Sequence, residues 1–262
     1  MKNCLILGFG RSGTSLMGGL LHQAGYFLGN HLHPARATNP KGFFEDMVIN
    51  RINEQILQRF DYSKLNPDYP RYPKTYSPYS PRDGHRWLSM IRPGTLIECH
   101  DATVLNKMRK VIGAKQPFAY KDPRFNYTLP VWRPLMPAGT RWICMFRNPS
   151  AVIKSVLHEC RSVPYLQDFY IDEELGFQIW FNSYRHWLDS RTPELRQNSI
   201  FVSYEDLIRR KGLMEIADFL DVPIKDDWIE PSLNRTEPDL VSPPYIRRLY
   251  EELRDLSISR DP

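Results

Sequence analysis

A glycine-rich loop near the start of the chain constrains the possible folds most strongly. An apolar run from Lys2 to Leu7 precedes the loop, which extends from Gly8 to Ser15, and helical apolar spacing continues from Ser15 to Ala24. In the order strand, loop, helix, the backbone amides of the loop turn inward, and the N-terminal end of the helix dipole attracts negative charge. The pattern therefore predicts a phosphate-type anion site in an α/β protein.

The loop has the spacing of a Walker A loop but lacks its lysine. Thr14 stands where that pattern has lysine, and Arg11 is the cation inside the loop. A nucleotide kinase needs the lysine on the transferring phosphoryl group and a metal-binding acid after a later strand, and the sequence offers no convincing second half of such a site. A P-loop kinase remains the second hypothesis, and a strand-to-helix turn without a ligand remains the plain structural alternative.

Further apolar segments recur along the chain, with enough residues between them for helices. Predicted strands are Leu96–Glu98, Phe118–Tyr120, Arg141–Phe146 and Ile200–Val202. Predicted helices are Thr103–Val111, Ala151–His158, Glu173–Arg191, Leu213–Leu220 and Pro244–Leu256. We expect a P-loop-like three-layer α/β fold with a central, mainly parallel sheet flanked by helices. The aromatic residues of the helix at 173–191 are expected mainly in the core.

The length of 262 residues suits one domain. A stretch at about 61–94 is rich in Pro, Tyr and Arg, which excludes a regular helix or a central strand. We expect residues 1–262 to form a single domain that carries this stretch as an irregular surface loop or lid.

The bulk composition fits an ordinary cytoplasmic protein. The net charge is +5, but the basic residues are dispersed and no nucleic-acid module is present, so we expect no nucleic-acid partner. The four cysteines have neither zinc-ligand spacing nor a disulfide pattern. No apolar run approaches the length of about 18 residues that spans a membrane, and no secretory segment precedes the first strand. The oligomeric state cannot be derived from these features.

Several motifs together point to one family. They are Phe9–Ser15, Asn39–Asp46, Tyr120–Arg124, Arg147–Pro149 with Ser155, Val202–Leu207 and, more weakly, Ile229–Arg235. In these segments the chain resembles the sulfotransferases that use 3′-phosphoadenosine 5′-phosphosulfate (PAPS), in the branch common among bacterial enzymes and the Golgi-type carbohydrate and tyrosyl enzymes. The resemblance implies a P-loop-like fold and transfer of a sulfuryl group from PAPS to a hydroxyl acceptor, with PAP as the product and without a metal.

The resemblance also assigns the contacts to the 5′ side of the donor. Arg11 would grip the bridging region. The 5′-phosphate would be held by the amides and hydroxyls of Ser12, Gly13, Thr14 and Ser15.

A second set of residues resembles the family's 3′-phosphate signature. Arg147 can bind a phosphate through two N–H groups, and Ser155 follows eight residues later, about two helical turns on, which returns its hydroxyl toward the same strand end. Tyr204 would supply a wall for adenine. The glycine-rich closing loop of the cytosolic enzymes is missing, so Arg235 is the remaining candidate for that part of the 3′-phosphate site.

Sulfuryl transfer demands cations at the leaving oxygen and a base for the acceptor hydroxyl. Arg11 and Lys121 are the candidate cations, and a surface lysine paired with Asp122 is the alternative for Lys121. Glu45 is the first candidate for the base, since the resemblance places a glutamate after the first helix. The rivals for this role are Asp46, Asp122 and His100.

A hypothesis from another class is a noncatalytic module that binds a nucleotide or a polyanion. It predicts binding of the donor product without turnover, whereas a kinase predicts dependence on Mg²⁺ and ATP. The acceptor is open among small metabolites, sugars, lipids and peptide tyrosine.

Overall fold

The protein is described by a computed structural model that covers residues 1–37, 39–59 and 76–259. Its strands are β1 (Cys4–Leu7), β2 (Ala119–Lys121), β3 (Arg141–Phe146) and β4 (Ser199–Ser203). Its α-helices are α1 (Thr14–Gln23), α2 (Met47–Leu57), α4 (Ala102–Ile112), α5 (Phe125–Trp132), α6 (Pro149–Ser162), α7 (Glu173–Ser190), α8 (Pro193–Gln197), α9 (Tyr204–Leu207), α10 (Leu213–Leu220) and α11 (Pro244–Asp255). Short 3₁₀ helices are η1 (Arg86–Leu88), η2 (Arg133–Leu135), η3 (Pro164–Leu166) and η4 (Pro231–Leu233).

The four strands form a parallel sheet in the order β2-β1-β3-β4. Successive side chains of a strand point to opposite faces, so β1 contributes to two cores. Cys4 and Ile6 pack with α1 and α10, whereas Leu5 and Leu7 join the cluster on the other face. All of β1 is buried, as expected for a parallel sheet that helices cover on both faces.

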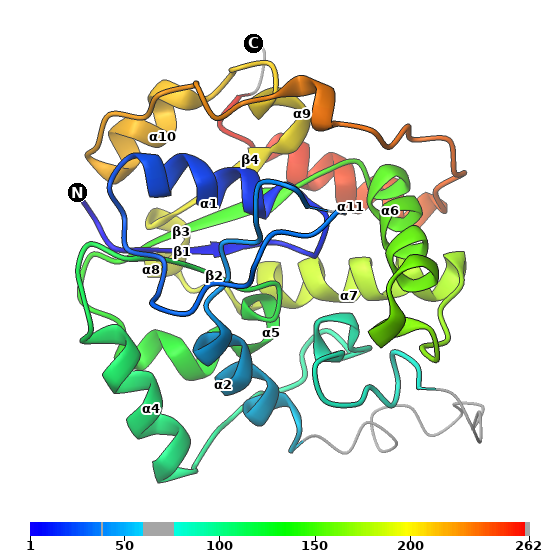
Figure 1. The fold of residues 1–262 in the computed structure, drawn as a ribbon, viewed down its shortest axis with the longest axis horizontal. Helices are drawn as coiled ribbons and strands as arrows, with labels where there is room; N and C mark the ends of the chain where they lie inside the picture. Colours follow the sequence, from blue (N-terminus) through cyan, green and yellow to red (C-terminus); the bar gives the residue numbers. More distant parts are fainter. Residues whose placement is uncertain (38, 60–75, 260–262) are drawn as a thin grey trace.

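Figure 1 shows the helices as layers around this sheet. In that view α1 and α10 lie above the sheet, α5 and α7 lie below it, and α2 and α4 lie farther out on the same side as α5. Trp180, Tyr184 and Trp187 of α7 are fully buried in the lower layer. The predicted P-loop-like three-layer α/β fold is therefore confirmed, as is the core position of these aromatic side chains.

The carboxyl ends of the strands bring the predicted donor residues to one edge of the sheet. Gly8 follows β1, Lys121 ends β2, Arg147 follows β3, and Tyr204 follows β4. Because β1 lies between β2 and β3, the connections on its two sides run in opposite directions, and the loop after β1 occupies the switch point where open α/β sheets bind ligands.

The structure differs from the sequence-based expectations in one predicted strand and in helices that were not predicted, and it describes only part of the irregular stretch. Leu96–Glu98 is not a strand but part of the loop before α4. Of its side chains only Ile97 is buried, whereas Leu96 is 69% exposed, so the segment anchors the loop rather than joining the sheet. The helices α2, α5, α8 and α9 were not predicted. Of the stretch at 61–94, residues 61–75 lie outside the described residues, and residues 76–94 contain the short helix η1.

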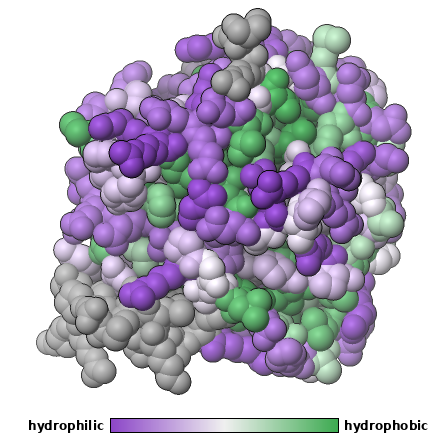
Figure 2. Space-filling model, turned by 180° about the vertical axis from the view of Figure 1, so that it is seen from behind, coloured by the Kyte–Doolittle hydropathy of each residue, from purple (hydrophilic) through white to green (hydrophobic). Residues whose placement is uncertain are grey.

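The reverse face of the molecule is largely hydrophilic, with hydrophobic side chains gathered in separate areas (Figure 2). Within the described ranges, none of the helices combines the length and the apolar character needed to cross a membrane.

Candidate functional site: an anion loop beside a buried lysine–glutamate pair

The loop after β1 requires glycine at two positions. Gly8 and Gly13 have φ angles of 135° and 86°, which residues other than glycine rarely adopt. A Cβ atom on Gly8 would lie 2.4 Å from the carbonyl oxygen of Met145, and one on Gly13 would lie 2.4 Å from the Tyr204 ring. Arg11 also has a positive φ, 70°. The loop is therefore a tightly packed turn at the N-terminus of α1, where free amides and the helix dipole favour an anion.

Buried side chains hold this loop from the lower layer. The amide of Gly8 donates to Oδ1 of Asn126 at 2.9 Å, and the amide of Phe9 donates to the Tyr184 hydroxyl at 3.2 Å. The same hydroxyl lies 3.1 Å from Oγ of Ser12, and burial raises the pKa of Tyr184 well above its ordinary value. Sequence reasoning placed Tyr184 in the core but missed its polar contact with the loop.

The side chain of Arg11 points to α6. Its Nε donates to Oγ of Ser155 at 3.0 Å, and its terminal nitrogen lies 3.5 Å from a carboxylate oxygen of buried Glu159. The structure thus brings together two predicted donor-site residues, Arg11 and Ser155, which are far apart in the sequence.

Arg147 lies in a second cluster, with polar and aromatic partners. Its guanidinium donates to Oδ1 of Asn234 at 2.7 Å and to the Thr236 carbonyl at 3.2 Å, and its Cζ lies 4.7 Å from the centre of the Tyr204 ring. Burial lowers the pKa of Arg147, and the nearby Tyr204 and Glu205 partly oppose that effect. Arg235 itself is exposed, whereas its neighbours Asn234 and Thr236 contact Arg147.

Lys121 is almost completely buried at the end of β2. Its ammonium donates to Oε1 of Glu45 at 2.5 Å, to the carbonyl of Phe43 at 3.1 Å and to Oγ of Ser15 at 3.2 Å. The hydroxyl of Ser15 also donates to the Phe43 carbonyl, at 3.2 Å. These contacts join the candidate cation and the candidate base directly to the anion loop.

A hydrogen-bond chain continues from Glu45 to a histidine. The side-chain amide of Asn50 donates to Glu45 at 3.2 Å and to Asp122 at 2.5 Å, and its oxygen lies 2.6 Å from Nε2 of His33. Because an amide oxygen can only accept, Nε2 of His33 must carry a proton, and a neutral His33 therefore has its lone pair on Nδ1. Sequence reasoning missed both Asn50 and His33, since α2 was not predicted and neither residue belongs to a recognised motif.

The rival base candidates have other partners. Asp46 is the N-cap of α2 and accepts from the amides of Val48 and Ile49, as well as from that of His31. Asp122 is fully buried and pairs with Arg124 at 3.1 Å. His100 precedes α4, is largely exposed and lies 3.6 Å from Glu98. Among these candidates, Glu45 is the carboxylate that pairs with Lys121 and, through Lys121, is connected to Ser15 of the loop.

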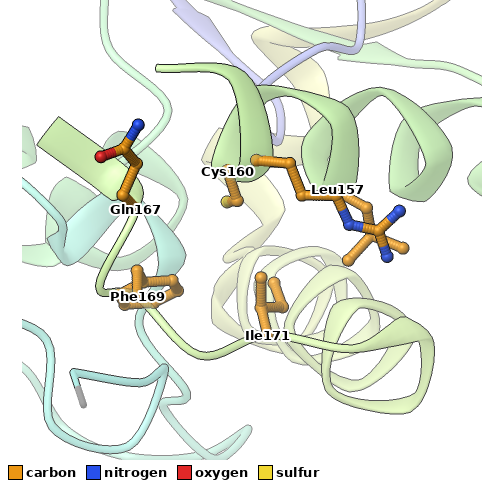
Figure 3. Close-up of a pocket in the computed structure, with 6 residues that line it drawn as sticks. Leu157, Cys160, Gln167, Phe169 and Ile171 are labelled. Atoms are coloured by element: carbon orange, nitrogen blue, oxygen red, sulfur yellow. The ribbon is translucent and has the colours of Figure 1, made fainter. Parts of the chain in front are cut away.

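A hollow of about 300 Å³ lies elsewhere, beside the C-terminal end of α6 (Figure 3). Figure 3 shows Cys160, Phe169 and Ile171 directed into it. Its lining includes none of the predicted site residues. Burial raises the pKa of the Cys160 thiol to about 12, so this thiol is not activated as a nucleophile.

Comparison with known proteins identifies the family. The sequence profile of the sulfotransferase domain matches residues 2–240. The chain belongs to the sulfotransferase family. Family membership makes it a sulfotransferase enzyme and decides against the P-loop kinase.

Solved structures agree in fold with this sulfotransferase. The sulfotransferase domain from the curacin biosynthetic pathway superposes with a TM-score of 0.55 and 14% identity, covering 96% of this chain and 97% of that one. The sulfotransferase domain from the Synechococcus PCC 7002 olefin synthase gives a TM-score of 0.52 and 19% identity, with coverage of 96% and 95%. No curated protein sequence matches the chain.

Proposed function

We propose that this sulfotransferase takes the sulfuryl group from PAPS and transfers it in line to the hydroxyl group of a small molecule, sugar or lipid. The observation that carries the proposal is the contact of Lys121 with both Ser15 of the anion loop and Glu45. The proposed cation for the leaving oxygen and the proposed base for the acceptor are thus in contact with each other next to Ser15 of the anion loop. PAPS, when bound, supplies an activated sulfuryl group on a phosphate leaving group.

The donor side rests on residues that fit phosphates chemically. The amides and hydroxyls of Ser12, Gly13, Thr14 and Ser15 line the N-terminus of α1 and would hold the 5′-phosphate. Arg11 would neutralise charge in the bridging region. Ser155 accepts from Arg11, and a hydroxyl that accepts one hydrogen bond can donate its own proton, here to a phosphate oxygen.

The 3′-phosphate is proposed to bind at Arg147, whose guanidinium lies over the Tyr204 ring and can present two N–H groups to an anion by exchanging its contacts with Asn234 and Thr236. Tyr204 is then placed to contact the adenosine part of the donor. Arg235 is exposed and lies between Asn234 and Thr236, the two residues that contact Arg147. It would add a second cation to the 3′-phosphate site.

On the acceptor side, Glu45 would receive the hydroxyl proton while Lys121 balances the charge that develops on the leaving oxygen. A lysine ammonium has three N–H donors, and the present contacts of Lys121 use all of them. Lys121 must therefore exchange one contact to reach the donor. Its partners Ser15 and Glu45 lie on the donor and acceptor sides, so the exchange can proceed within the site.

The wider setting is also part of the proposal. We propose a single domain over residues 1–262 with an insertion at 61–94, and a bacterial, cytoplasmic enzyme that uses no metal. The cysteines at 4, 99, 144 and 160 are free thiols, which suits a reducing compartment.

Calorimetric titration without magnesium tests the donor assignment. Adenosine 3′,5′-bisphosphate is expected to bind in the micromolar range, with ATP and ADP much weaker. Arg11→Ala should weaken the bisphosphate by about 10- to 150-fold, because a hydrogen bond to a charged group contributes roughly 1.5 to 3 kcal/mol. The matched control is Arg248→Gln, which removes an exposed arginine of α11. Preference for ATP, or equal affinities of Arg11→Ala and the control, would contradict the assignment.

A further inference from the structure

Arg36 lies between two aromatic rings, one of which belongs to the segment that carries Glu45. Its guanidinium carbon is 5.7 Å from the centre of the Phe43 ring and 5.5 Å from that of the Tyr165 ring. Both distances are within the range of about 6 Å in which a cation is attracted to a ring face. The two rings belong to segments more than 100 residues apart, so Arg36 lies where these segments meet.

Among the described residues, Arg36 also differs from its neighbouring cations in that no acid pairs with it. Arg11 pairs with Glu159, Lys121 with Glu45, and Arg82 with Asp168. In the described ranges, no carboxylate oxygen lies within ion-pair distance of Arg36. A guanidinium held by ring faces keeps its N–H groups available in its own plane, the arrangement that binds a carboxylate or phosphate through two parallel hydrogen bonds.

The backbone ties Arg36 to the reacting centre. Its amide and carbonyl both bond to Asn39, whose side chain donates to Oγ of Ser15 at 3.0 Å. The carbonyl of Phe43 accepts from Ser15 and Lys121, while the ring of Phe43 contacts Arg36. The anion loop and Arg36 therefore flank the segment that carries Glu45.

The Tyr165 side of Arg36 is held in place as well. The Tyr165 carbonyl accepts from Arg82 at 2.9 Å. The Tyr165 ring packs edge-on against the buried His85 ring, with 5.7 Å between the ring centres. Burial raises the pKa of the Tyr165 phenol to about 12, with Glu159 acting in the same direction and Arg36 in the opposite one. Tyr165 therefore offers Arg36 a neutral ring rather than a competing anion.

We propose that Arg36 is the anion-binding group of the acceptor site, and that the acceptor is an alcohol carrying a carboxylate or phosphate group. The inference rests on the proposed transfer function and narrows its acceptor class. The donor's phosphates are assigned to the loop and to Arg147. Arg82, the other cation beside Tyr165, pairs with Asp168, so we assign the anion of the acceptor to Arg36. Aromatic walls on both sides also favour an acceptor with an apolar or ring-shaped portion near its charge.

The test uses donor labelled in the sulfuryl group together with a small-molecule extract of bacterial cells. The extract is split on an anion-exchange resin into an unbound and a bound fraction. Half of the bound fraction is treated with phosphatase, which separates phosphate-bearing acceptors from carboxylate-bearing ones. Wild type, Arg36→Gln, Arg36→Lys and the control Arg248→Gln are compared for transfer of label, and each is titrated with adenosine 3′,5′-bisphosphate.

We expect wild type and Arg248→Gln to label the bound fraction equally. Arg36→Gln should lose at least about 10-fold of this transfer, as expected for a charge-assisted contact. Arg36→Lys should fall in between, because it keeps the charge without the planar fork. All variants should bind the bisphosphate alike. Label in the unbound fraction alone, label in neither fraction, equal transfer by Arg36→Gln and wild type, or lost bisphosphate binding in Arg36→Gln would overturn the inference. Failure of wild type to bind the bisphosphate would instead overturn the donor assignment.

Discussion

The Nζ atom of Lys121 lies 2.5 Å from Oε1 of Glu45, and both side chains are largely shielded from water. Lys121 comes from the end of the edge strand β2, and Glu45 comes from the segment before α2. The close ion pair holds both side chains in a fixed orientation in the absence of ligands. It also couples the two groups, because movement of Lys121 toward the donor leaves Glu45 without its strongest partner.

Glu45→Gln and Lys121→Met are each expected to lower kcat by about 100-fold or more, since the first removes the base and the second removes the cation at the leaving oxygen. Glu45→Gln should keep its affinity for adenosine 3′,5′-bisphosphate. Because the two residues act on the same transfer, the double variant should lose less than the product of the single losses. Steady-state kinetics of the three variants with one acceptor measures this coupling.

The controls for this prediction separate Glu45 from its rivals. Glu98→Gln, an exposed glutamate next to His100, should leave kcat unchanged. Asp46→Asn keeps an oxygen that can cap α2, because asparagine and aspartate are equally good N-caps, and it should retain kcat per folded molecule. If Asp46→Asn lost the turnover while Glu45→Gln kept it, the base would be Asp46.

Arg147→Ala is expected to raise the donor KM by about 10- to 100-fold with a much smaller change in kcat, because the 3′-phosphate is remote from the reacting sulfur. Arg147→Lys should recover only part of the affinity, since lysine lacks the planar pair of donors. Asn234→Ala removes the 2.7 Å contact that orients the guanidinium and should have a weaker effect of the same kind. An unchanged donor KM in Arg147→Ala would remove it from the donor site.

The sequence predicts the donor side of the site better than the acceptor side, for a physical reason. The donor residues follow strands, and parallel strands bring their carboxyl ends to one edge whatever the details of packing. Arg11, Lys121, Arg147 and Tyr204 could therefore be placed near one another from strand positions alone. Their distances and partners, such as Arg11 with Ser155, still depended on the side chains of α6.

The acceptor side depends on packing between segments that carry no periodic signal. His33, Asn50 and Glu45 are joined by hydrogen bonds between a loop and the helix α2, which the apolar pattern did not reveal. The contact of Arg36 with Tyr165 crosses more than 100 residues. The error at Leu96–Glu98 has a similar origin, because a three-residue apolar run does not show whether a neighbouring strand exists to pair with it.

Gly13→Ala is expected to abolish tight binding of adenosine 3′,5′-bisphosphate. The substitution meets both a positive φ of 86° and the Tyr204 ring, which lies 2.4 Å from the position of the new Cβ. Gly139→Ala is a matched control, since Gly139 has a φ of 77° but open space around the position of its Cβ. Both variants should lose about 1 to 2 kcal/mol of unfolding free energy through backbone strain. Gly13→Ala alone should displace Tyr204 and lose at least about 10-fold in affinity, and equal affinities would contradict the packing of Tyr204 on the loop.

The free energy of unfolding is expected to decrease as the pH is lowered, because His186 titrates differently in the folded and unfolded chains. Burial lowers the pKa of His186 to about 4 from an ordinary value of 6.5, with a backbone contact to Arg92 and the charge of Asp189 opposing the shift. Its ring packs edge-on against Tyr127. Between pH 4 and pH 6.5 the unfolded chain therefore binds more protons at this site than the folded chain, so lowering the pH through this window favours unfolding. The contribution of His186 is on the order of 3 kcal/mol across the whole window.

Urea unfolding at several pH values between 4.5 and 7.5 checks this sign and magnitude. His85, whose pKa is also lowered by burial, and the carboxylates contribute to the acid limb, so the informative quantity is the difference between variants. His186→Gln should give a flatter dependence of unfolding free energy on pH than wild type, even where the variant is less stable overall. His100→Gln changes an exposed histidine and should leave the slope unchanged. Parallel curves for His186→Gln and wild type would show that the pKa of His186 is the same in the folded and the unfolded chain, against this prediction.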